Sequence, residues 1–154
     1  MKPQIGVIFL VLAALIAMGT AAAHLSCIYL GPECYAAQMA PPLIVESAIN
    51  GTYLAPIGTI FASGIFVVLG LYALSAAGFT GLLLDKLPLV NYAIYTIATL
   101  CIIRGVLPLQ LWLRHPEKIS ESILYVGIVW LITGLLYLIG YRICSTKPTS
   151  ILSV

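Results

Sequence analysis

Residues 5–23 read IGVIFLVLAALIAMGTAAA, an apolar run that contains no charged side chain. An α-helix rises about 1.5 Å per residue, so a helix of this length covers most of the roughly 30 Å hydrocarbon core of a bilayer. Lys2 precedes the run and gives it a polar flank. The stretch therefore predicts a first transmembrane helix near the beginning of the sequence.

A secretory signal peptide is the alternative interpretation of the same stretch. It would have a basic start, an apolar run and small residues at 21–23 before His24, where a peptidase would cleave. The apolar region of a signal peptide is usually about 7–15 residues long. The run seen here is longer, which favours a helix that is retained, and removal of residues 1–23 is the alternative.

The composition of the whole chain excludes an ordinary soluble fold. Of its 154 residues, 62% are hydrophobic and 8% are charged, whereas about a quarter of the residues in a soluble domain are charged. The net charge is +2 and the basic residues are scattered, which excludes a nucleic-acid-binding protein. The length suits four spans of about 20 residues each, so residues 1–154 are predicted to form a single membrane domain.

Three further apolar runs follow the first. Turn signals such as Gly31-Pro32 and Asn50-Gly51 mark a more polar stretch between the first run and the second. The predicted fold is an all-α integral membrane protein, a four-helix transmembrane bundle with one sizeable extracytoplasmic loop between helices 1 and 2. The predicted spans are 5–23, 57–78, 88–111 and 122–141, with an outer loop at 24–56, a short surface helix within it at 43–49 and a cytoplasmic tail at 142–154.

The positive charges predict the orientation of these spans. Cytoplasmic segments of membrane proteins carry an excess of Lys and Arg. Four basic residues fall on one side of the predicted spans, and two fall on the other side together with acidic residues. Both termini are therefore predicted in the cytoplasm at a plasma (inner) membrane, with the long loop outside. The four are Lys2, Lys86, Arg142 and Lys147, and the two are Arg114 and Lys118.

Small residues recur at helical spacing within the apolar runs. Ala13 and Ala17 do so in the first run, and Ala98, Cys101 and Gly105 do so in the third. Small side chains let the backbones of neighbouring membrane helices approach closely. The pattern predicts a tightly packed bundle.

Cys27 and Cys34 both fall in the predicted outer loop, with Gly31-Pro32 between them to turn the chain. In an oxidising compartment such a pair closes a small loop, so the spacing predicts a structural disulfide. A redox-active dithiol is the alternative. The absence of a C-x-x-C pair from the sequence argues against it.

A metal or cofactor site is predicted where the first and third helices meet the outer surface. His24 and His115 are the candidate metal or haem ligands, because two imidazoles on neighbouring helices can bind zinc, copper or haem iron. Arg104 and Gln110 are the candidate binding residues for a quinone or lipid in the same region. A disulfide between the two loop cysteines would remove both thiols from any metal site.

Arg104 stands out because a cation inside an apolar helix costs about 2.5 to 3.5 kcal/mol on insertion scales. Its depth depends on Pro108, which can bend or end a helix. If the helix continues to Leu113, the guanidinium belongs to the interior of the span. If the helix stops at Pro108, the side chain reaches the surface by snorkelling.

The sequence offers no catalytic arrangement, because no Ser/His/Asp set, phosphate-binding glycine loop or carboxylate pair can be assembled in the spans. The predicted function is that of a non-enzymatic subunit or partner-binding module of a membrane assembly, with the stapled loop as its recognition surface. Its partners are the lipid bilayer and a membrane protein or second copy. One alternative is a binder of a quinone, lipid, haem or metal near the outer leaflet, and another is an oligomeric channel or transporter.

Overall fold

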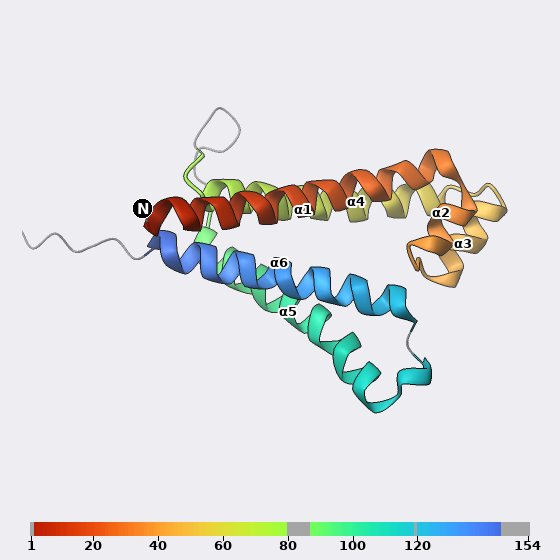
Figure 1. The fold of residues 1–154 in the computed structure, drawn as a ribbon. Coiled ribbons are helices and arrows are strands. Elements are labelled where there is room, and N and C mark those ends of the chain that lie inside the picture. The colour runs from red at the N-terminus through yellow and green to blue at the C-terminus, as the bar shows by residue number, and fades with distance from the viewer. Residues whose placement is uncertain (1, 80–86, 119, 146–154) are drawn as a thin grey trace, which may run out of the picture. The chain divides into compact units, whose positions relative to one another are not determined.

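The computed structural model of the protein describes residues 2–79, 87–118 and 120–145 (Figure 1). Within these residues all regular secondary structure is helical and no strand occurs. The elements are α1 (Lys2–Leu30), α2 (Pro32–Ala37), α3 (Pro42–Ile49), α4 (Leu54–Ala76), α5 (Val90–Arg114), the 3-10 helix η1 (Pro116–Lys118) and α6 (Glu121–Ser145).

Four of these helices are long and apolar enough to cross a membrane. They are α1 from Gln4 onward, α4, α5 and α6. The structure thus confirms the predicted all-helical architecture and its four candidate spans. The residues used to predict the orientation include Lys86 and Lys147, which lie outside the described residues.

Helix α1 is longer than the predicted span 5–23, because it continues to Leu30. Residues 24–30 contain neither Gly nor Pro, so nothing in them interrupts the helix. The helix ends where Gly31 adopts a φ of 81°, a left-handed conformation that favours glycine, and Pro32 then begins α2. His24 and Cys27 therefore lie on a helix and not in a loop, which corrects the predicted loop boundary.

The other candidate spans also differ from the prediction at their ends. Helix α4 begins before Pro56, which is tolerated because the first turn of a helix has backbone N–H groups without helical partners. Helix α5 passes through Pro108 and continues to Arg114. Helix α6 extends through residues 142–145 of the predicted tail, and the rest of that tail lies outside the described residues.

The predicted outer loop is largely folded. The short helix expected at residues 43–49 is present as α3, and α2 precedes it. We call residues 31–53 the α2–α3 lobe. Neither short helix is long enough to be stable alone in water, so the lobe depends on contacts with its neighbours.

The chain forms two compact units. One comprises Leu15–Gly70 and contains the α2–α3 lobe, and the other comprises Met1–Ala14 and Leu71–Val154. Helices α1 and α4 contribute to both units without a break. The division therefore falls inside helices and not at a linker.

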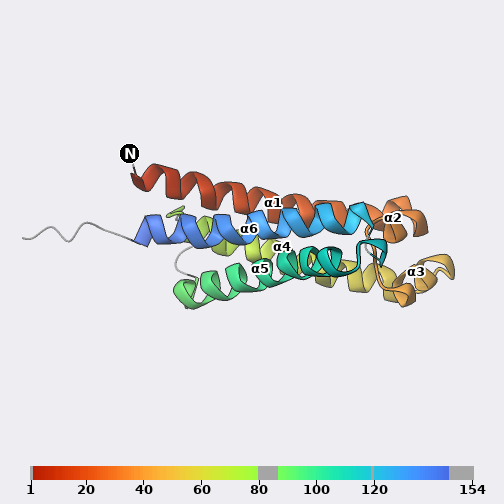
Figure 2. The same ribbon diagram turned by 60° about the horizontal axis from the view of Figure 1, so that its bottom comes forward.

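In the unit that contains α5 and α6, these two helices form an antiparallel hairpin held by close backbone contacts (Figure 2). A Cβ added at Gly105 would lie 2.5 Å from the backbone nitrogen of Leu131, and one added at Gly134 would lie 2.9 Å from the carbonyl oxygen of Ala98. Ala98, Cys101 and Gly105 are all buried, as the small-residue pattern predicted. The helices approach so closely only because these positions carry little or no side chain.

Helix α6 also crosses the first part of α1 at a pair of glycines. A Cβ on Gly6 would lie 2.8 Å from the carbonyl oxygen of Gly140, and a Cβ on Gly140 would lie 3.0 Å from that of Gly6. The close packing of helices in this unit thus depends on crossing positions that carry little or no side chain.

Candidate functional site

The two cysteines of the predicted pair lie close together, although Cys27 belongs to a helix and not to a loop. Cys27, near the end of α1, and Cys34, in α2, lie at disulfide distance, with their Cα atoms 5.1 Å apart. The turn at Gly31 between them brings α2 back beside α1, and the N–H of Gly31 donates to the carbonyl of Cys27. Because both sulfur atoms belong to the disulfide, neither is a thiolate ligand for a metal.

Two hydrogen bonds hold α2 against the long helices of its unit. The side-chain amide of Gln38 donates to the carbonyl oxygen of Ala23 on α1 at 2.6 Å. The hydroxyl groups of Tyr35 and Thr59 share a hydrogen bond of 3.1 Å and link α2 to α4. Tyr35 is buried together with Cys27 in the small core of the lobe. Helix α2 is therefore fastened to α1 and to α4.

Ser47 of α3 provides the corresponding link to the start of α4. Its hydroxyl accepts a hydrogen bond of 2.9 Å from the backbone N–H of Ala55, a first-turn group that has no partner within α4. The hydroxyl also lies 2.6 Å from that of Thr52. Ser47 is buried, so this network is shielded from solvent and orders the turn between α3 and α4.

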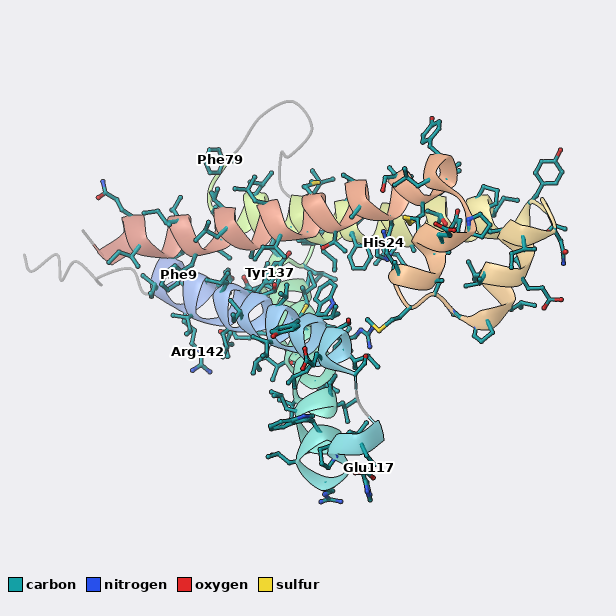
Figure 3. All side chains as sticks on the ribbon, turned by 45° about the vertical axis from the view of Figure 1, so that its right-hand side comes forward. Phe9, His24, Phe79, Glu117, Tyr137 and Arg142 are labelled. Atoms are coloured by element: carbon teal, nitrogen blue, oxygen red, sulfur yellow. A yellow bond between two sulfur atoms is a disulfide. The ribbon has the colours of Figure 1, made fainter. Side chains whose placement is uncertain are left out.

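His24 lies on α1, in the same unit as the lobe (Figure 3). Its half-buried ring meets the ring of Phe66 edge to face, with centroids 5.1 Å apart. Its Nδ1 atom is shielded from solvent and makes no well-formed hydrogen bond with the described residues, although the carbonyl of Thr20, one turn earlier, interacts with it weakly. The structure thus places His24 in a helix contact.

The other predicted site residues lie in the second unit. Arg104 and Gln110 are exposed on α5, and because they are six residues apart they face directions separated by roughly 120°. His115 follows the end of α5 and is exposed, with its Nδ1 atom 3.6 Å from a carboxylate oxygen of Glu117. Glu117 lies in the α5–α6 turn (Figure 3).

The structure does not bring the four predicted site residues together within either unit. His24 belongs to one unit, and Arg104, Gln110 and His115 belong to the other. Among the described residues, no group of three or more His, Cys, Asp or Glu side chains could hold a metal ion. Arg104 makes no ion pair with any described residue.

A different arrangement emerges on α5, whose exposed surface carries polar side chains among apolar ones such as Leu100, Ile103 and Leu107. Helix α6 of the same hairpin exposes an apolar surface between Tyr125 and Ile139. Four exposed polar residues of α5 share one side of the helix, and we call them the α5 polar face: Tyr92, Thr96, Thr99 and Gln110. Asn91 and Tyr95 contact Tyr141 of α6, and Arg104 points to another side of the helix.

The sequence contained a signal for this face. Tyr92, Thr96, Thr99 and Gln110 recur at helical spacing, within a narrow sector of the α5 surface. The spacing alone does not tell whether such a sector points into a bundle or away from it.

Comparison of the chain with protein-family models, with curated proteins and with solved structures gives no match.

Proposed function

We propose that this chain is an integral membrane protein with four spans and both termini in the cytoplasm, and that it is a non-enzymatic subunit that binds another membrane protein through the α5 polar face. The observation that supports the proposal is the α5 polar face, a row of exposed polar side chains on a helix long enough to span a bilayer. The hydrocarbon core offers no hydrogen bonds to such a surface, whereas a neighbouring protein helix does.

Arg104 gives a separate argument for a protein neighbour of α5, because it lies outside the α5 polar face. It lies ten residues before the end of α5, about 15 Å along the axis at the rise of a helix. A guanidinium exposed to lipid there would cost about 2.5 to 3.5 kcal/mol on insertion scales. Pro108 adds to the polarity, because it has no N–H to donate to the carbonyl of Arg104 four residues earlier. A partner that supplies a carboxylate or hydrogen-bonding groups at this level removes both costs.

Helix α6 provides the contrast within the same hairpin. Val129, Ile132 and Leu135 are exposed on its surface, and such aliphatic groups suit contact with lipid. Helix α5 also exposes aliphatic side chains, such as Leu100 and Leu107, so the contrast with α6 lies in the α5 polar face alone. The difference supports lipid against α6 and protein against the α5 polar face.

A homo-oligomer is the second candidate, favoured by the same face. Copies of the chain that met through α5 would surround a path lined by Thr96, Thr99 and Gln110, and a path of that kind suits an oligomeric channel.

Site-specific photo-crosslinking in native membranes tests the proposal. A photoreactive side chain at Thr99 is expected to give one defined protein adduct, and the matched position Ile132 on α6 is expected to give lipid adducts only. The adduct from Thr99 should weaken several-fold in Gln110→Leu, which removes a polar group from the same side of α5, with the Cys27–Cys34 pair still oxidised. The mass of the adduct distinguishes a second copy from a different protein.

Two results would overturn the proposal. Thr99 would give lipid adducts like those of Ile132 if α5 faced the bilayer. An adduct within the same chain would show that the α5 polar face is covered by other helices of this protein.

A further inference from the structure

The turn between α2 and α3 is an exposed apolar tip. Residues 39–43 read MAPPL and contain no charged or hydrogen-bonding side chain. Met39 is 41% exposed and Leu43 is 63% exposed, and both prolines between them are exposed as well. We call residues 39–43 the apolar tip.

The contacts of the lobe fix the level of this tip along α1. Gln38, the residue before the tip, donates to the carbonyl of Ala23, which lies seven residues before the end of α1, or about 10 Å along the helix. Tyr35 bonds to Thr59, five residues into α4 and about 8 Å from its first residue. The lobe therefore lies beside the ends of α1 and α4 and does not stand above them (Figures 1 and 2).

The backbone of the tip is suited to an environment without water. The N–H groups of Met39 and Ala40 donate to carbonyls of α2, and Pro41 and Pro42 have no N–H group. The carbonyl of Pro41 accepts from the first turn of α3. Unsatisfied backbone groups are what normally keeps a loop out of lipid, and in this loop the two N–H groups before the prolines are satisfied.

Two exposed tyrosines lie near the ends of the long helices. Tyr29 at the end of α1 is 91% exposed, and Tyr53 just before α4 is 82% exposed. Tyrosines are enriched where a membrane helix crosses the headgroup region. With these rings among the headgroups, the tip lies deeper than the headgroups, at the margin of the acyl chains. The acidic Glu33 lies at the opposite end of α2 from the tip.

We propose that the apolar tip inserts into the lipid bilayer beside α1, so that the α2–α3 lobe is an interfacial anchor whose partner is lipid. The apolar contact with acyl chains stabilises the lobe at this depth. The disulfide and the bond from Gln38 to Ala23 keep the tip at one level. The inference rests on the proposed insertion of α1 and α4 into a membrane, and it does not depend on what binds to α5.

Tryptophan fluorescence in reconstituted vesicles tests the inference. The background variant carries Trp112→Phe and Trp130→Phe, and a single tryptophan is introduced by Met39→Trp, by Leu43→Trp or, as a control at the other end of α2, by Glu33→Trp. The vesicles contain phosphatidylcholine brominated near the headgroup end of its acyl chains. Phe61→Trp, at an exposed apolar position of α4, reports separately on insertion of the span.

The expected result is that tryptophan at position 39 or 43 loses most of its fluorescence to the brominated lipid and little to aqueous iodide, whereas position 33 shows the reverse. Iodide quenching at 39 and 43 would overturn the inference, because the tip would be in water. Protection from both quenchers would also overturn it, because the tip would be covered by protein. If Phe61→Trp is quenched by the lipid while 39 and 43 are not, only this inference fails. If Phe61→Trp is not quenched either, membrane insertion fails with it.

Discussion

The α5–α6 hairpin and the α2–α3 lobe are held in opposite ways. The hairpin is assembled where side chains are missing, since Gly105 and Gly134 let the two backbones meet. The lobe is assembled where side chains form specific bonds, namely the Cys27–Cys34 disulfide and the hydrogen bonds of Ser47.

The difference follows from the length of the helices. A helix of 25 residues satisfies its own backbone hydrogen bonds, so its packing needs only close contact over a long surface. Helices of six and eight residues gain little from their own hydrogen bonds and need fixed points on their neighbours. We therefore expect the long helices to tolerate the loss of a hydrogen bond but not added bulk at a crossing. We expect the short helices to tolerate added bulk but not the loss of a bond to a neighbour.

Adding bulk at the hairpin crossing is expected to have the largest effect. Gly105→Leu places atoms within 3 Å of backbone atoms of α6, which cannot move aside as a side chain would, and it should lower the free energy of unfolding by about 3 kcal/mol or more. Titration of the detergent-solubilised protein with dodecyl sulfate measures this. Gly64→Leu is the matched control, because nothing lies within 4 Å of the Cβ position at Gly64. Equal losses in the two variants would contradict the role given to the crossing.

Removing the disulfide is expected to have the next largest effect, confined to the lobe. By the loop-entropy relation, a disulfide that closes a loop of this size stabilises the folded state by about 2.5 kcal/mol. The double variant Cys27→Ser with Cys34→Ser should therefore raise the equilibrium constant for local opening of α2 by the factor that corresponds to this free energy. Amide hydrogen exchange of α2 and α3 followed by mass spectrometry reports on it, with α6 as the internal reference. Unchanged exchange in α2 would show that its hydrogen bonds suffice.

Ser47→Ala removes the acceptor for the backbone N–H of Ala55 inside a buried site. An unsatisfied buried donor costs about 1 to 3 kcal/mol, so exchange at the first turn of α4 should become faster. Ser26→Ala serves as the control, because the Ser26 hydroxyl is exposed and, among the described residues, bonds to a carbonyl of its own helix. If both variants behave as the parent protein does, water replaces the hydroxyl of Ser47.

Tyr35→Phe is expected to have the smallest effect, about 1 kcal/mol, because it removes one hydroxyl partner and keeps the packed ring. A double-mutant cycle with Thr59→Val isolates the hydrogen bond between the two residues. The same change at the exposed Tyr53 should leave stability unaltered. Additive effects in the cycle would mean that the two hydroxyls do not stabilise each other.

The sequence allowed the candidate spans and the cysteine pairing to be predicted because both depend on short stretches of chain. An apolar run such as 5–23 is helical wherever it packs, and Cys27 and Cys34 are close in sequence with a turn between them. The end of α1 was harder to predict. His24 looked like the first residue of a loop because it is polar, yet a helix continues until a residue such as Gly31 stops it.

The candidate site was less predictable, because it depends on the direction in which each side of a helix faces. Arg104, Gln110 and the two histidines were grouped by their expected depth, but depth does not fix direction around a helix. The polarity of Thr96 and Thr99 was evident from the sequence, and their exposure became visible only once the glycine contacts had turned the other side of α5 toward α6.

The bond from Gln38 to the carbonyl of Ala23 bears on the biogenesis of the protein. The peptide bond between Ala23 and His24, where a signal peptidase would cut, lies within a continuous helix, and its oxygen is engaged by the lobe. A peptidase needs its substrate in an extended conformation, so this segment would have to unwind and release Gln38 before cleavage. In the folded protein the closure of the lobe thus protects this bond, and any proteolytic maturation at this site has to precede the folding of α2.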